Sequence, residues 1–188
     1  NQQDALNVWD TDYKAVWHLK ETPPALAIDS TINPNDGTPE NSPTQATGKI
    51  DGSLSFVPNV LEQNVNVPNS ASLQLATNMT VSAWARTTSS DAQARIIVAK
   101  WKFGQVPPAQ NYWLGKLDAS TFNFYVDSGQ NVGISLGLVN DGLWHHIVGV
   151  ADAGGTPALR LYVDGVQQAT VGYSGTSQTG TSELRIGR

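Results

Sequence analysis

The segment Asp29 to Thr38 gathers side chains of the types that bind a hard metal ion. It combines carboxylate, amide and backbone oxygen atoms in one short turn. These are the ligands that Ca²⁺ prefers, at coordination numbers of roughly six to eight. The sequence therefore predicts a structural calcium site at Asp29, Asn35 and Gly37. The alternative is a turn whose Asp and Asn side chains satisfy their own backbone, without a metal.

A second candidate site consists of aromatic residues on predicted strands. Strand residues point alternately to opposite faces, which places Trp84 among polar neighbours within Met79 to Arg86. If the aromatic residues share the concave outer face of one sheet, they form a platform on which sugar rings stack. The alternative is that they cover a sheet or fill the core. The predicted ligand-binding residues are Trp84, Trp113, Tyr125, Tyr162 and Arg86.

The histidines and cysteines offer little metal chemistry. The chain has no cysteine, which excludes thiolate ligands and disulfides. His145 and His146 are adjacent, so on a strand they point to opposite faces and cannot both bind one ion in a simple way. No paired carboxylate is evident beside them, and His18 is the remaining histidine. We therefore predict hydrogen-bonding roles for the histidines rather than a zinc site.

These side chains need β-strands to position them. Short runs of β-branched and aromatic residues, separated by Gly, Pro, Asn and Asp, recur along the chain and predict a sandwich or barrel. Asp164-Gly165 favours a tight hairpin turn, whereas Glu21 to Gly48 and Lys102 to Gln110 predict long loops. The predicted strands are Ala15 to Leu19, Ser53 to Phe56, Val65 to Val67, Met79 to Thr87, Ile96 to Trp101, Tyr112 to Lys116, Thr121 to Val126, Val132 to Leu136, Trp144 to Ala151, Ala158 to Val163, Val166 to Thr170 and Glu183 to Ile186.

Composition narrows the class of protein. The chain has 188 residues, 39% hydrophobic and 14% charged, which predicts a single folded domain over residues 1–188. The net charge of −5 argues against a nucleic-acid partner, because phosphate binding needs clustered Lys and Arg. No apolar run approaches the ~20 residues that span a bilayer, so membrane insertion is not expected. The first residues lack a signal-peptide pattern, and any export signal is expected upstream.

Several segments stand in an order and spacing that one known family shares. They are Ala15 to Glu21, Asp29 to Thr38, Gly48 to Phe56, Val65 to Pro68, Met79 to Trp84, Trp144 to Val148 and Leu161 to Gly165. Together they resemble the laminin-G-like, bacterial and archaeal branch of the concanavalin A-like lectin and glucanase superfamily, over nearly the whole chain. In the first loop, Ile32 and Pro34 replace two glycines of the family pattern. The resemblance implies an all-β fold: a two-sheet antiparallel β-sandwich of the concanavalin A-like jelly-roll type.

The resemblance also implies a closing strand. In the family the chain continues past the equivalent of Leu184 to Arg188 into a strand that pairs near the N-terminal strand. An Asp from that strand completes the family's calcium site. This chain ends before it. We therefore expect a piece excised from a larger multi-domain protein and trimmed before its closing strand.

Two catalytic patterns known from this superfamily are not found in the chain. Its glucanases carry Glu-x-Asp-x-x-Glu on one strand, since glycoside hydrolysis needs two carboxylates beside the scissile bond. Its lyases use Tyr, His, Arg and Gln or Asn, but no family motif surrounds Tyr112, His146 or Arg95. The glutamates of the chain are Glu21, Glu40, Glu62 and Glu183. No catalytic residue is predicted.

These observations favour a non-catalytic binding module of a secreted or cell-surface multi-domain protein. Its ligand would be a glycan or polysaccharide, and Ca²⁺ would be a structural ion. One alternative is a structural or adhesive spacer that contacts neighbouring domains or cell-surface proteins. Another is a polysaccharide-degrading enzyme with an unrecognised site. Joint exposure of Trp84, Trp113 and Tyr125 in one groove would favour the glycan-binding module over the spacer.

Overall fold

The computed structural model describes residues 8–57, 62–102, 110–127, 129–177 and 179–187. Its internal contacts divide the chain into two compact units, Asn1–Leu73 with Glu183–Arg188, and Gln74–Ser182. Among the described residues, no helix is long and apolar enough to cross a membrane. The expectation of one domain over residues 1–188 stays a prediction.

In the first unit, one buried strand pairs on both sides with antiparallel neighbours. Strand β4 lies between β1 and β13, and β2 and β3 form a separate hairpin. Val65 and Val67 of β4 are fully buried. The bounds are β1 Thr38–Glu40, β2 Thr44–Thr47, β3 Gly52–Ser55, β4 Asn64–Val67, β13 Leu184–Ile186 and the 3₁₀ turn η1 Ala71–Leu73.

The predicted strand Ala15 to Leu19 is wrong. The segment forms only an isolated bridge, between Trp17 and Asp29. The N–H of Val16 donates to the Asp29 carboxylate at 3.0 Å rather than to a neighbouring strand. Leu19 has φ of 54°, in the left-handed region that strands do not adopt. A side-chain acceptor and a left-handed residue therefore replace strand pairing here.

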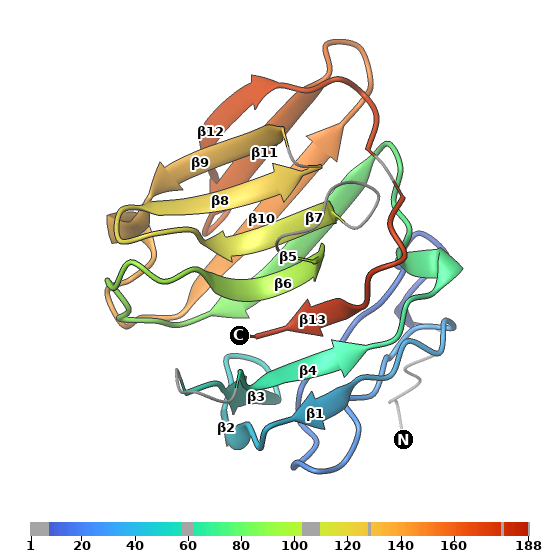
Figure 1. Cartoon of the computed structure of the whole chain (residues 1–188), viewed down its shortest axis with the longest axis vertical. Coiled ribbons are helices and arrows are strands. Elements are labelled where there is room, and N and C mark those ends of the chain that lie inside the picture. Colours follow the sequence, from blue (N-terminus) through green and yellow to red (C-terminus); the bar gives the residue numbers. More distant parts are fainter. Residues whose placement is uncertain (1–7, 58–61, 103–109, 128, 178, 188) are drawn as a thin grey trace. The chain divides into compact units, whose positions relative to one another are not determined.

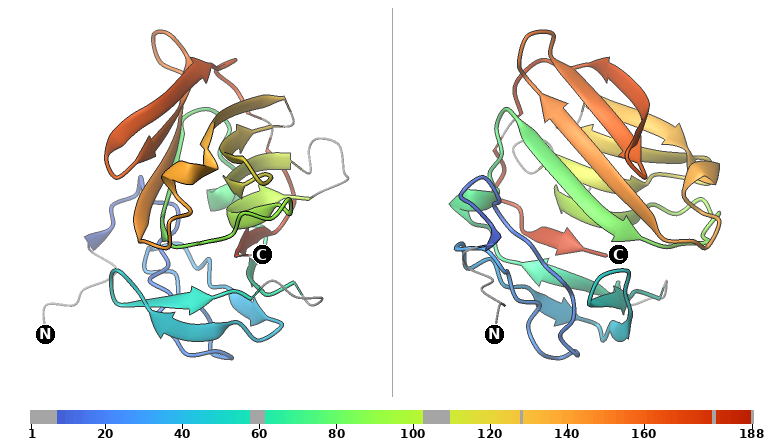
Figure 2. Two further views of the ribbon diagram at one scale, coloured as in Figure 1. Left: turned by 90° about the vertical axis from the view of Figure 1, so that its left-hand side faces the viewer. Right: turned by 180° about the vertical axis from the view of Figure 1, so that it is seen from behind.

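The second unit is an antiparallel β-sandwich (Figures 1 and 2). Strands β6, β7, β8 and β9 pair in this order in one sheet, and β12, β11, β10 and β5 form the other. The bounds are β5 Met79–Ala85, β6 Arg95–Trp101, β7 Gln110–Lys116, β8 Thr121–Val126, β9 Gln130–Ser135, β10 His145–Asp152, β11 Ala158–Val163, β12 Val166–Gly172 and the 3₁₀ turn η2 Leu136–Leu138. The predicted all-β, two-sheet antiparallel fold is confirmed.

The core of the second unit lies between its two sheets. Leu114 and Phe124, opposite each other on β7 and β8, are fully buried, as is Leu161 on β11. Gly149 on β10 meets the Phe124 ring from the other sheet: a Cβ atom at Gly149 would lie 2.4 Å from Phe124 Cγ. The alternating side chains that face away from this interior are the ones available for binding.

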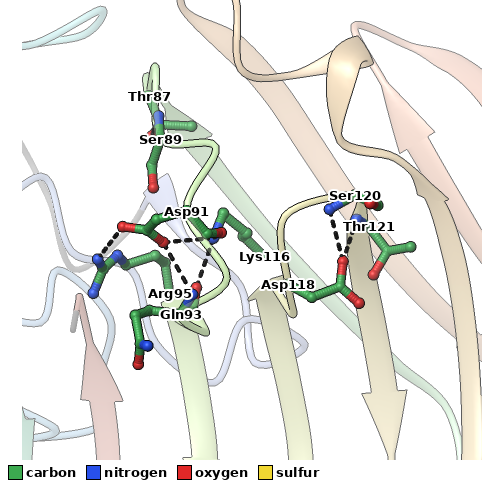
Figure 3. A network of polar contacts seen from close by, with 9 residues as sticks. All are labelled: Thr87, Ser89, Asp91, Gln93, Arg95, Lys116, Asp118, Ser120 and Thr121. Atoms are coloured by element: carbon green, nitrogen blue, oxygen red, sulfur yellow. Dashed lines mark hydrogen bonds and ion pairs between the residues drawn. The ribbon is translucent and has the colours of Figure 1, made fainter.

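A buried lysine anchors the connection between β5 and β6 (Figure 3). Lys116 Nζ donates to Asp91 Oδ1 at 2.9 Å, to the Gln93 carbonyl at 2.6 Å and to the Asp91 carbonyl. The bonds from Lys116 and Arg95 lower the pKa of Asp91 to about 2. The lysine therefore has three acceptors for its three N–H groups, which compensates for its burial.

His145, at the start of β10, joins two turns of the second unit. Its Nδ1 lies 2.7 Å from Asp164 Oδ2, and its Nε2 lies 3.1 Å from Asp141 Oδ1. The expected hydrogen-bonding role is confirmed for this residue, although paired carboxylates were not expected. Asp164, followed by Asp141, raises the pKa of His145 despite the opposing effect of burial. Conversely, the bond to His145 is the main cause that lowers the pKa of Asp164.

This bridge predicts a defined pH dependence of stability. Because the pKa of His145 is raised above its ordinary 6.5, its stabilising contribution is complete below pH 6.5 and is lost as pH rises through the raised value. The lowered pKa values of Asp141 and Asp164 preserve the bridge at acidic pH until both carboxylates are protonated. We expect the stability difference between wild type and His145→Gln to shrink from pH 6 to pH 9, measured by urea unfolding. A constant difference would contradict the bridge.

Candidate functional site

The structure places the predicted aromatic residues on two different sheets of the second unit. Trp84 on β5 and Tyr162 on β11 lie in one sheet, whereas Trp113 on β7 and Tyr125 on β8 lie in the other. The condition that these four residues share one face is therefore not met. Alternation along a strand predicts which side chains share a face, but it does not predict which sheet the strand joins.

Trp113 and Tyr125 belong to an aromatic cluster on the outer face of the β6–β9 sheet. They are cross-strand partners, and their ring centroids lie 5.4 Å apart at an interplanar angle of 67°. Trp101 meets Tyr125 in a similar edge-to-face contact, at 5.9 Å and 66°. Trp113 is only 2% exposed and packs with Ile96 and Ala99. It therefore supports the partly exposed Tyr125 and Trp101 rather than offering its own ring.

Small and amide residues lie next to this cluster. Asn131 on β9 is the cross-strand partner of Tyr125, and Gly133 is the partner of Asn123. A Cβ atom at Gly133 would lie 2.5 Å from Asn123 Oδ1, so a larger residue at position 133 would require the Asn123 side chain to move. Asn131 and Gly133 are both exposed. We call this surface the aromatic–amide face; it consists of Trp101, Trp113, Tyr125, Asn131 and Gly133.

The aromatic–amide face contains polar groups that lack partners. The Trp113 Nε1 atom is buried and forms no hydrogen bond within the described part of the chain. The exposed side-chain amide of Asn131 likewise has no partner among the described residues. The exposed Asn131 amide can therefore bond to water or a ligand at this surface, whereas the buried Trp113 Nε1 atom cannot reach one.

On the outer face of the opposite sheet, the predicted binding residues already contact other side chains. Trp84 is 37% exposed, but its ring stacks on His146, with centroids 5.2 Å apart. The Tyr162 hydroxyl donates to Gln167 Oε1 at 3.0 Å. Arg86 places its guanidinium 5.3 Å from the centroid of the Trp144 ring, a cation–π contact. On this face, therefore, the aromatic rings and Arg86 already contact other side chains, although Trp84 remains partly exposed.

The predicted metal-binding loop lies in the first unit, where its side chains bond to the protein itself. Asp29 Oδ1 accepts the N–H groups of Val16 and Thr31, both at 3.0 Å, and Asp29 Oδ2 accepts the Asn35 amide at 3.1 Å. Gly37 packs on β4, where a Cβ atom would lie 2.3 Å from Val65 Cγ1. This geometry agrees with the self-satisfied turn that the sequence left open.

Calcium binding by this loop stays a prediction. Asn35 Oδ1 already accepts the Ser70 hydroxyl at 2.6 Å, so two of the expected ligands have protein partners. No cluster of three or more His, Cys, Asp or Glu side chains able to hold a metal occurs among residues that the structure describes. An ion bound at Asp29 would have to share the carboxylate with its N–H donors or displace them.

Comparison with protein families agrees with this architecture. Residues 60–188 match the model of a laminin-G-type family described as the concanavalin A-like lectin/glucanases superfamily. The chain belongs to this superfamily. No curated protein matched the sequence. The concanavalin A-like jelly-roll fold predicted from the sequence is thus confirmed.

Solved structures share the superfamily fold at low sequence identity. One is a structure of botulinum neurotoxin type C, a toxin whose cell entry depends on interaction with two ganglioside molecules. It has a TM-score of 0.67 and 12% identity, and the match covers 92% of this chain and 42% of the neurotoxin chain. The binding domain of botulinum neurotoxin DC with rat synaptotagmin II has a TM-score of 0.68 and 12% identity, covering 92% and 43%. Domain 4 of AbnA, a GH43 extracellular arabinanase from Geobacillus stearothermophilus, was solved in complex with arabinotriose. Its structure has a TM-score of 0.57 and 16% identity, and the match covers 82% of this chain and 73% of that chain. The chain spans less than half the length of the two neurotoxin chains.

Three residues of the aromatic–amide face are not among the predicted ligand-binding residues: Trp101, Asn131 and Gly133. Gly133 lies inside the predicted strand Val132 to Leu136, but Asn131 lies just before it, and Asn is typical of turns. Between them lies Val132, followed by Ile134, and both are buried. This alternation is the signal in the sequence that identifies Asn131 and Gly133 as outward-facing positions of a strand.

Proposed function

We propose that this protein is a non-catalytic glycan-binding module of a secreted or cell-surface multi-domain protein. The observation that carries the proposal is the aromatic–amide face, where partly exposed Tyr125 and Trp101 adjoin the unpartnered amide of Asn131. Aromatic rings pack against the C–H faces of sugars, and amides bond to their hydroxyls. The known binding of arabinotriose by a structural neighbour supports a glycan as the ligand.

A neutral glycan fits this face better than an acidic one. The five residues of the aromatic–amide face carry no charge, and the chain as a whole has a net charge of −5. An acidic sugar would therefore be repelled by the protein and would find no Arg or Lys within the face. Neutral polysaccharides such as arabinan are the first ligands to test.

Substitutions within the aromatic–amide face test the proposal. Tyr125→Ala is expected to weaken binding about tenfold, since an aromatic contact contributes roughly 0.5–1.5 kcal/mol. Asn131→Ala removes an exposed side chain and is expected to weaken binding about fivefold, the effect of one hydrogen bond. Affinities are measured by titration calorimetry against the polysaccharide selected from a panel of neutral and acidic glycans.

Trp84→Ala is the matched control, because it removes an exposed aromatic residue from the other sheet. Wild-type affinity for Trp84→Ala, with losses in the other two variants, supports the aromatic–amide face. The reverse pattern would move the site to the sheet that carries Trp84, Tyr162 and Arg86. Thermal unfolding of each variant separates lost binding from lost folding.

A module that binds a protein partner is the second candidate. It is supported by the structural likeness to a neurotoxin binding domain that was solved with synaptotagmin. Absence of binding to every glycan in the panel would favour this spacer or adhesion role. Repeating the panel with millimolar calcium and with chelator tests the calcium prediction at the same time, as does thermal unfolding in the two buffers. Release of oligosaccharides would instead indicate an enzyme.

A further inference from the structure

Strand β12 is an exposed edge of the second unit. It pairs with β11 on one side, and no other strand of the described chain pairs with its second side. Every residue of Val166–Gly172 is exposed except the half-buried Ala169. An edge of this kind presents a row of backbone N–H and C=O groups to any strand that approaches it.

The usual protection of an edge strand by charge is missing here. Residues 165–182 contain no Lys, Arg, Asp, Glu or Pro. Strand β9, the edge of the facing sheet, contacts β12, and residues 128–140 are also without charge (Figure 1). Charged residues and proline are two of the devices that keep natural edge strands apart; a β-bulge is another, and β12 has one. Neither of these two edge strands thus carries a charged side chain, in a chain of net charge −5.

The same strand leaves apolar side chains uncovered. Val166 and Val171 are opposite Val163 and Leu159 of β11, both of which are buried in the core. They therefore belong to the core-facing side, yet they are 61% and 41% exposed. A further strand beside β12 would cover them.

Because of a bulge in β12, the order of apolar and polar residues along the strand is the same when it is read from either end. The pairing register shifts between Leu161 and Tyr162, so that Gln168 is an extra residue in β12. Val166 and Val171 are five positions apart and, because of this bulge, share one face. Gln167 and Thr170, opposite Tyr162 and Arg160, share the other face.

We propose that two copies of this protein associate through antiparallel pairing of β12 with β12 of a second copy. In this register Val166 lies opposite the partner's Val171, and Gln167 lies opposite the partner's Thr170. The symmetric pattern places apolar residues against apolar residues and polar against polar, as a two-fold interface requires. A second copy is the favoured partner because the pattern of β12 is complementary to itself, and β12 brings no charged side chain into the interface.

Charge variants at the paired positions test both the association and its register. Gln167→Lys with Thr170→Lys places lysines opposite lysines and is expected to weaken dimerisation at least about tenfold. Gln167→Lys with Thr170→Glu places opposite charges across the interface and is expected to restore it. Both double variants lose the bond between Tyr162 and Gln167, so they are matched in that respect. Sedimentation equilibrium of the full chain measures the dissociation constants.

The control is Thr80→Lys with Ser82→Lys, which adds the same charge at exposed positions of β5, on the far side of the same sheet. Its dissociation constant is expected to equal that of wild type. A wild-type protein that stays monomeric up to about 1 mM would overturn the proposal. So would a dimer that the Lys/Lys variant leaves unchanged, or one that the Lys/Glu variant fails to restore.

Discussion

Replacing Gly149 with alanine is expected to lower the free energy of unfolding by at least about 2 kcal/mol, the scale of an overpacked core. The new Cβ atom would lie 2.4, 2.5 and 2.9 Å from three carbons of the Phe124 ring. That ring is completely buried between the sheets, so it has no solvent to move into. In an unobstructed strand the same change is expected to stabilise by roughly 0.5–1 kcal/mol. The sign of the effect therefore reports how closely the two sheets approach.

Gly172→Ala provides the matched control for this experiment. Gly172 also lies in a strand of the second unit, but no atom lies within 4 Å of its hypothetical Cβ. We expect its unfolding midpoint in guanidinium chloride to equal or exceed that of wild type. Adding Phe124→Leu to Gly149→Ala relieves the clash, so the double variant should lose less stability than the sum of the single variants. Equal effects of Gly149→Ala and Gly172→Ala would contradict the packing described here.

Most strands of the second unit could be predicted from the sequence, but their pairing could not. Val and aromatic residues at alternate positions correctly indicate most strands of the second unit, because half of each strand is buried. The pairing of Met79–Ala85 with His145–Asp152 leaves no such signal. Strands distant in the chain are brought together by the packing of their buried faces, which no single strand encodes. The aromatic residues were therefore assigned correctly to outward faces but not to sheets.

Two short polar strands were not predicted from the sequence. Thr38–Glu40 and Thr44–Thr47 both fall inside the predicted loop Glu21 to Gly48. Neither contains an apolar β-branched or aromatic residue, and none of their side chains is fully buried. Their pairing is supplied by neighbours, β4 for the first and β3 for the second. Composition alone cannot distinguish such strands from polar loops.

In the candidate binding surface, the sequence likewise predicts which residues of a strand share a face, but not how residues of other strands pack against them. Trp113 and Tyr125 were identified from alternation, and the structure confirms that they adjoin each other. The burial of Trp113 could not be predicted, because Ile96 and Ala99 from another strand cover it. This burial separates two roles that the sequence combined: support by Trp113, and the contact with a ligand that we propose for Tyr125.

Replacing Lys100 with methionine is expected to remove a rise in stability that the wild type shows at alkaline pH. Lys100 is completely buried on β6, and its Nζ donates to the Ser182 carbonyl at 2.5 Å. Burial lowers its pKa from 10.5 to about 8. Between these values the unfolded chain binds more protons than the folded one, so the free energy of unfolding rises with pH. The slope approaches 1.4 kcal/mol per pH unit, roughly the value for one proton.

The comparison is made by urea unfolding of both proteins from pH 7 to pH 10.5. Burial also raises the pKa of Tyr112, but that residue is present in both proteins and its effect cancels in their difference. Below pH 8 the cost of burying the charged lysine is fully present, so Lys100→Met is expected to be most stable relative to wild type there. Lys102→Met, which removes an exposed lysine nearby, should leave the wild-type slope intact. A stability difference between wild type and Lys100→Met that does not change with pH would mean that Lys100 stays charged in the folded protein up to its ordinary pKa. The bond to Ser182 would then have to compensate for burial of the ammonium group.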